Sequence, residues 1–169
     1  MSAGAQNPIA NIADIPLRTV GDGRNFKGQC GRIGAAIGAR KLGCQLHVVQ
    51  AGQKAFPRHA HHANEEMFFI VSGSGIYRFG AESREVRAGD VIAAPAGRVE
   101  TAHQILNTGE AELRYLAFST RLDPDVVEYA DSNKFLVASQ VPDGGGLVGA
   151  GFRFIGRMDS AVDYWDGEK

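Results

Sequence analysis

Cysteine, tryptophan and long apolar runs are scarce in this chain of 169 residues. The two cysteines, Cys30 and Cys44, are fourteen positions apart and form no C-x-x-C pair. Two cysteines do not make a disulfide framework, so the class of small disulfide-stapled domains is excluded. No stretch approaches the roughly 18 consecutive apolar residues that a membrane-spanning helix needs. We therefore expect no association with a membrane.

An excess of charge of either sign is also missing. Eighteen Lys and Arg residues against nineteen Asp and Glu residues leave a formal net charge of −1. Without a basic excess, nucleic acid is not an expected partner. The first eighteen residues, MSAGAQNPIANIADIPLR, do not place a basic segment before an apolar run, so no signal peptide is predicted. Together with the few cysteines, this favours a cytoplasmic location.

Glycine, by contrast, is abundant. The chain has 22 glycines among its 169 residues, nearly twice the usual share of about 7%. They fall between short apolar runs, and in residues 42–50 apolar and polar side chains alternate, which is typical of a half-buried strand. The length suits one domain, and the pattern indicates an all-β fold.

Strands are predicted at residues 42–50, 65–72, 76–79, 84–87, 91–94, 102–106 and 112–119, each followed by turn residues. This regular spacing favours a sandwich, jelly roll or barrel. Residues 15–41 are interpreted as weak strands leading into the core. Residues 123–130 are predicted to hold a helical turn, with Asp123 as its cap and Pro124 in its first position. Two further strands are expected at residues 135–138 and 152–155.

Four of the five histidines fall in two short segments. The first segment contains His59, His61 and His62, followed by Glu65 and Glu66. Residues i and i+2 of a strand share a face, so His59 and His61 would point the same way and His62 the opposite way. Two imidazoles and one carboxylate from adjacent strands make half of a metal site. His103, in the second segment, would complete it, whereas the isolated His47 is interpreted as a surface or hydrogen-bonded residue.

The first segment resembles the first motif of the cupin family. His59 and His61 match its H-x-H element, Glu66 follows after four residues, and Gly73 follows Glu66 after six. Gly52 lies one residue too far upstream to be the leading glycine. Glu65 competes with Glu66 as the carboxylate, because the family accepts a gap of three or four residues, but the six-residue gap to Gly73 favours Glu66.

The second cupin motif is also present, with one departure. Gly89, Pro95 and Gly97 match its first half, and His103 and Asn107 match its second half. Five residues separate Gly97 from His103, where the family has two, and the strict register would put Glu100 at the histidine position. We prefer His103, because three extra residues in a loop are easier to accommodate than the loss of the histidine.

The resemblance covers about residues 42–119 and implies a double-stranded β-helix, or jelly-roll barrel. Residues 1–41 and 120–169 would then be N- and C-terminal extensions, the second packing on the barrel or on a dimer partner. The resemblance further implies one divalent transition metal ion (Fe, Mn, Ni, Co or Zn) held by His59, His61, Glu66 and His103. It also implies a small organic molecule as substrate or ligand. The edge strands of an open jelly roll need covering, so we expect a homodimer in which an N-terminal strand or a sheet face pairs across the interface, as in many cupins. Dioxygenase or isomerase chemistry and non-catalytic binding of a sugar or acid both remain open, and no catalytic residue is assigned.

The last eighteen residues are unusually aromatic for a tail, with Phe152, Phe154, Tyr164 and the sole tryptophan, Trp165. Aromatic side chains contribute most when they are buried. We therefore expect residues 150–166 to dock, as a strand and then an anchor at Tyr164 and Trp165, on the barrel or on a partner subunit.

Overall fold

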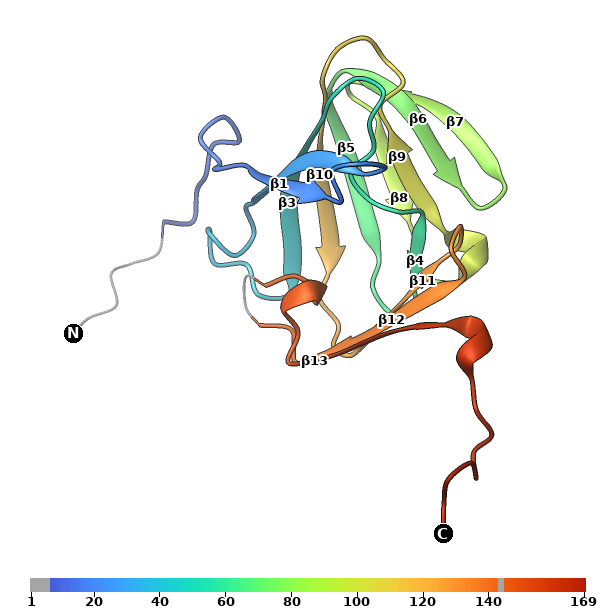
Figure 1. Cartoon of the computed structure of the whole chain (residues 1–169). Helices are drawn as coiled ribbons and strands as arrows, with labels where there is room; N and C mark the ends of the chain where they lie inside the picture. Colours follow the sequence, from blue (N-terminus) through green and yellow to red (C-terminus); the bar gives the residue numbers. More distant parts are fainter. Residues whose placement is uncertain (1–6, 143–144) are drawn as a thin grey trace, which may run out of the picture.

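The computed structural model of the chain describes residues 7–142 and 145–169. Two antiparallel sheets face one another in an all-β jelly roll (Figure 1). The six-stranded sheet, here sheet A, has the order β1 (Arg18–Gly21), β2 (Lys27–Arg32), β3 (Leu42–Val49), β10 (Leu113–Thr120), β5 (Glu66–Ser72) and β8 (Val91–Ala94). The seven-stranded sheet, here sheet B, has the order β13 (Phe152–Arg157), β12 (Lys134–Ser139), β11 (Asp125–Tyr129), β4 (His59–His61), β9 (His103–Leu106), β6 (Ser74–Phe79) and β7 (Glu82–Arg87). The expected fold class is confirmed.

Alternation along β5 decides what faces the interior. Phe68 and Ile70 are buried in the core between the sheets, whereas Met67 and Phe69 are 49% and 37% exposed on the outer face. Glu66 has the same parity as Phe68 and Ile70, so its carboxylate also faces inward. At the end of this strand Gly73 has a φ of +84°, and a Cβ there would lie 2.6 Å from the Glu112 carbonyl oxygen, so only glycine fits the turn.

The N-terminal segment covers part of the outer face of sheet A. Ile33, Leu46 and Val48 form a second buried cluster there, against which Ile12, Ile15, Leu17, Ile37, Cys44 and Leu116 pack. The weak strands expected in this segment are β1 and β2, which pair with one another and, through β2, with β3.

The C-terminal segment extends sheet B. β11 pairs with β4 on one side and β12 on the other, and β13 closes this edge of the sheet. The predicted helical turn at residues 123–130 is therefore wrong. Val126, Val127 and Tyr129 are β-branched and aromatic residues that suit a strand, and pairing on both sides outweighs the local cap and proline signal. The only helical pieces in the described residues are the 3-10 turns η1 (Val99–Thr101), η2 (Leu147–Gly149) and η3 (Met158–Ser160).

The tail shows a mixed outcome. The strand expected at residues 152–155 is confirmed as β13, which pairs with β12. Tyr164 and Trp165 pack edge-to-face on one another but remain 82% and 72% exposed, and the tail runs away from the sandwich (Figure 1). Docking of these two residues on their own barrel is therefore wrong. Along residues 7–142 and 145–169, no helix has the length and apolar character required to cross a membrane.

Candidate metal centre

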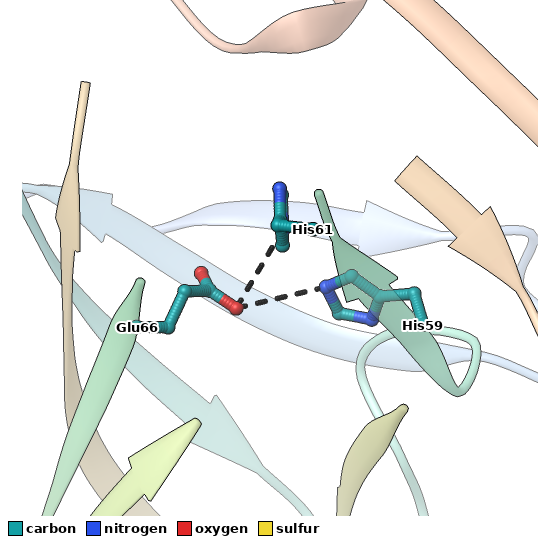
Figure 2. Close-up of side chains that lie close together, drawn as sticks. All are labelled: His59, His61 and Glu66. Carbon is teal, nitrogen blue, oxygen red and sulfur yellow. Dashed lines mark ion pairs between the residues drawn. The ribbon is translucent and has the colours of Figure 1, made fainter. Parts of the chain in front are cut away.

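Four side chains from both sheets meet in the interior. His59 and His61 come from β4 and His103 from β9, and the backbone register places His59 directly opposite His103. Glu66 reaches them from β5 in the facing sheet. Its Oε2 atom lies 3.7 Å from Nε2 of His59, 3.7 Å from Nε2 of His61 and 2.9 Å from Nε2 of His103. Figure 2 shows the two β4 imidazoles directed at this oxygen.

The other nitrogen of each imidazole is hydrogen-bonded elsewhere. Nδ1 of His59 donates to the Pro57 carbonyl oxygen at 2.8 Å, and Nδ1 of His61 donates to Oδ2 of Asp125 at 2.6 Å. A carbonyl and a carboxylate can only accept, so both rings carry their proton on Nδ1. When such a ring is neutral, its Nε2 lone pair is directed at the centre of the group.

Burial and charge set the protonation of the group. Burial lowers the pKa of His59 to about 4, against the attraction of Glu66. For His61, burial also opposes the charged ring, but the hydrogen bond and charge of Asp125, together with Glu66, raise the pKa overall. Burial alone would raise the pKa of Glu66, yet the hydrogen bond from His103 and the charges of His61 and His59 lower it to about 2. A carboxylate therefore faces the imidazoles at neutral pH.

These donors fit a metal ion. The ligand atoms of His59, His61 and Glu66 all lie within 4.8 Å of one another. Ligand atoms bound at about 2.1 Å around one tetrahedral ion lie about 3.4 Å apart, close to the spacing found here. Imidazole nitrogen with carboxylate oxygen suits a first-row transition metal better than calcium or magnesium. The side chains of His59 and Glu66 are still 20% and 17% exposed, so water reaches the group on that side.

The structure also separates the alternatives that the sequence left open. Glu65 is exposed, and only Glu66 faces the histidines. Glu100 is exposed on η1, where its Oε1 accepts the backbone N–H of Arg98, while His103 is buried beside Glu66. The extra residues before His103 thus form a 3-10 turn outside the site. His62 points away from the group, as its parity predicts.

Asn107 of the second motif has a structural role. It is 1% exposed, and its Nδ2 donates to the carbonyl oxygens of Val49 and Ala111 at 2.7 and 2.8 Å. Its Oδ1 accepts the backbone N–H of Gly109 at 3.0 Å. The side chain therefore ties the turn after β9 to β3. Tyr77 is likewise a core residue, since its hydroxyl donates to the Ala93 carbonyl oxygen at 3.2 Å.

Two residues near the group were not found from the sequence. Asp125 is 1% exposed and lies sixty-four positions from its partner His61. The helical reading of residues 123–130 concealed it, and only a strand assignment for this segment could have placed it beside β4. His47, expected at the surface or in a hydrogen bond, is 5% exposed, stacks on Tyr115 at 5.0 Å, and its Nδ1 has no hydrogen-bond partner in the described structure.

Comparisons with known proteins place these residues in a wider context. Residues 45–119, which include all four members of the group, match a family model described as Cupin domain. An uncharacterized protein of Methanocaldococcus jannaschii is 35% identical over 72 residues, covering 43% of this chain and 54% of that protein. An oxalate-binding protein of Thermotoga maritima is 32% identical over 59 residues, covering 35% of this chain and 46% of that protein. The chain thus spans about half the length of these curated relatives.

A solved structure resembles almost the whole chain. It comes from Acidithiobacillus ferrooxidans and is provisionally named a sugar phosphate isomerase. The TM-score is 0.76 at 22% identity, over 93% of this chain and 96% of that one. At this identity the likeness shows the fold alone, and it extends well beyond residues 45–119 into the terminal strands.

Proposed function

We propose that the part of the chain that matches the cupin family model, residues 45–119, holds one divalent transition metal ion with which it binds or transforms a small organic molecule. The observation that carries the proposal is the convergence of three Nε2 atoms on one Glu66 oxygen, at 3.7, 3.7 and 2.9 Å. We infer that His59, His61, Glu66 and His103 are the ligands and that the ion is Fe, Mn, Ni, Co or Zn.

Each proposed ligand has a distinct role. His59 and His61 present Nε2 because Pro57 and Asp125 hold their Nδ1 protons. Glu66 supplies the negative charge that offsets the cation and, being bound to it, is not free to act as a general base. His103 would hold the ion through Nε2 in the tautomer that carries its proton on Nδ1, which faces the Thr101 carbonyl oxygen at 3.3 Å. When bound, the ion polarises an oxygen atom of the bound molecule or, if it is iron, activates dioxygen.

The ligand class follows from this chemistry. A hard or borderline divalent ion with open positions binds molecules that offer oxygen donors, such as carboxylates, hydroxy acids and sugars. The oxalate-binding relative, named for a small dicarboxylate, supports this class. Isomerase or dioxygenase turnover of such a molecule is the catalytic form of the proposal. Stoichiometric binding without turnover is the second candidate, favoured by the name of the same relative.

The test begins with elemental analysis of the purified protein. We expect about one divalent transition metal ion per chain in the wild type and almost none in a double His59→Ala, His61→Ala variant. A His62→Ala variant is the matched control and should keep its metal. Full occupancy in the double variant would falsify the ligand assignment.

The two forms of the proposal are separated with oxalate as a probe. Metal-loaded protein should bind oxalate in calorimetry, and protein whose metal has been removed with a chelator should not. Conversion of oxalate over many turnovers would establish an enzyme, whereas unchanged oxalate at a stoichiometry near one would establish a binding protein. Absence of any binding by the loaded protein would exclude small dicarboxylates as the ligand class.

We also propose a homodimer, formed through the outer face of sheet A. Met67 lies opposite Phe118, and Phe69 lies opposite Val91, on adjacent strands of this face. These four side chains are between 36% and 66% exposed, an apolar patch that a monomer would leave in water. Light scattering at micromolar concentration should give twice the chain mass, and Phe69→Lys should halve it. A monomeric wild type would contradict this part of the proposal.

A further inference from the structure

Asp125 joins the metal centre from outside the cupin domain. It is the first residue of β11, beyond the matched residues 45–119. β11 pairs antiparallel with the ligand strand β4, and Val127 lies opposite His61 in the register. The Asp125 side chain is 1% exposed, and its Oδ2 accepts the Nδ1 proton of His61 at 2.6 Å. A residue of the C-terminal segment is thus in direct contact with a proposed metal ligand.

Burial of this carboxylate does not serve packing. Val127, which shares the inward face of β11, is buried in an apolar cluster with Leu136 and Ala138. An apolar side chain at position 125 would avoid the cost of removing a carboxylate from water. Replacing a buried ion pair by apolar residues often leaves stability unchanged or raises it. Asn64 and the Ala63 backbone N–H also stabilise the charged form of Asp125, but its ion-pair partner is His61 at 2.6 Å. The contact with a proposed metal ligand is therefore the clearest benefit of an aspartate here.

Glu128 provides the contrast on the same strand. Its Oε1 lies 2.8 Å from Nε2 of His62 and 3.1 Å from Nε of Arg98, on the opposite face of β11. An arginine and an imidazole satisfy this carboxylate, which is 6% exposed, without any metal. Asp125 has no arginine or lysine within ion-pair distance among the described residues, and its short contact is with His61.

We propose that Asp125 is a positioning residue of the metal centre, which fixes the proton of His61 on Nδ1 and aims the Nε2 lone pair at the ion. This inference rests on the proposed metal site. His59 is held by a neutral backbone carbonyl at 2.8 Å, so the two ligands on β4 are oriented by acceptors of different charge. A carboxylate acceptor also makes the imidazole a stronger electron donor to the ion. The C-terminal strand β11 is then a functional part of the site.

The first test measures the affinity of full-length variants for Co²⁺ alone, by competition with a chelator. Asp125→Ala should bind Co²⁺ about 10–100-fold more weakly than the wild type, the loss typical of partners that orient a metal ligand. Asp125→Asn keeps the shape and an oxygen acceptor but not the charge, and its affinity should lie between the two. Glu128→Gln breaks the corresponding pair on the other face and should leave the affinity unchanged.

The second test needs no metal. Nitrogen-15 NMR of the chelated protein at alkaline pH should place the His61 proton on Nδ1 in the wild type and in Glu128→Gln. In Asp125→Ala the proton should shift towards Nε2, which a merely structural role would not produce. If Asp125→Ala does not fold, as judged by circular dichroism, the isosteric Asp125→Asn decides by its Co²⁺ affinity. Wild-type affinity in a folded Asp125→Asn, or an unchanged His61 tautomer in a folded Asp125→Ala, would overturn the proposal.

The two tests also separate this inference from the metal proposal itself. If the wild type binds no Co²⁺ while the tautomer still shifts in Asp125→Ala, the metal proposal fails and the control of the His61 ring by Asp125 stands. If the wild type binds Co²⁺ and Asp125→Ala retains both the affinity and the tautomer, the metal proposal stands and this inference fails.

Discussion

His61 and His62 are neighbours in the chain, and each is paired with a carboxylate of β11, yet they lie in different regions of the molecule. His61 faces the interior, where it meets Asp125 at 2.6 Å and Glu66 at 3.7 Å. His62 faces outward, where it meets Glu128 at 2.8 Å beside Arg98. Inside, two further imidazoles surround the carboxylate of Glu66, whereas outside an arginine already neutralises Glu128. A histidine–carboxylate pair alone therefore does not indicate a metal site; the proposed site has three imidazoles around a carboxylate that lacks an arginine or lysine partner.

The largest effect expected from this difference concerns Glu66, which faces inward on β5, and Glu65, which is exposed just before that strand. Glu66→Gln removes the only anionic member of the interior group, and we expect Co²⁺ affinity to fall by at least about 100-fold. This equals or exceeds the largest loss of affinity typical when a residue that only orients a metal ligand is replaced. Glu65→Gln is the matched control and should bind as the wild type does. Equal Co²⁺ affinities in the two variants would mean that the inward carboxylate of Glu66 contributes no more to metal binding than the exposed carboxylate of Glu65.

A smaller effect is expected at His103. Its Nε2 is 2.9 Å from Glu66 but is not among the three ligand atoms that lie within 4.8 Å of one another. His103→Ala should therefore lower the Co²⁺ affinity about 10–100-fold while leaving a three-ligand site. The d–d absorption of bound Co²⁺ should change with the loss of one nitrogen. An unchanged spectrum and affinity would remove His103 from the ligand set and leave it as a hydrogen-bond partner of Glu66.

The buried His47 also predicts a pH dependence of stability. Burial lowers the pKa of His47 to about 4, while in the unfolded chain it returns to about 6.5. The contribution to stability is complete above pH 6.5 and is lost as the pH falls towards 4, because the unfolded state then binds the proton first. This histidine can cost up to about 3 kcal/mol over that range.

Chemical unfolding of the metal-free protein at several pH values measures this loss. The free energy of unfolding of His47→Phe should fall less between pH 7 and pH 4 than that of the wild type. A parallel decline in wild type and His47→Phe would show that His47 is not held neutral by burial.

The smallest effect is expected at the tail. With 72% of its surface exposed, Trp165 should contribute less than about 0.5 kcal/mol to the unfolding of a single chain. Its fluorescence should already lie at the solvent-exposed maximum and be quenched by iodide. A blue-shifted emission that moves to the red on dilution would instead show that a partner subunit covers the tail.

The four inner residues could be predicted from strand parity and from the resemblance to the cupin motifs. Strand parity separates His59 and His61 from His62, and the motif's spacing to Gly73 favours Glu66 over Glu65. His103 is preferred to Glu100 because extra loop residues are easier to accommodate than the loss of the histidine, and the structure places residues 99–101 in η1.

The contact of Asp125 with His61 depends on pairing between segments that are distant in the sequence. Asp123 and Pro124 carry a local helix signal, but β4 and β12 flank residues 125–129 on both sides and hold them as a strand. Neither partner is near in the sequence, so the contact between Asp125 and His61 could not be inferred. The exposure of Tyr164 and Trp165 has a similar origin, since aromatic composition favours burial but does not supply a surface to bury against.

The most direct test of the metal centre is the anomalous diffraction of a crystal grown with Co²⁺. The account predicts one strong peak in the interior, within bonding distance of Nε2 of His59, Nε2 of His61 and the Glu66 carboxylate, with Nδ1 of His61 still bound to Asp125. A peak beside His62 and Glu128 on the outer face would contradict it. So would the absence of a peak at the interior group when the Co²⁺ concentration is well above the dissociation constant measured in solution.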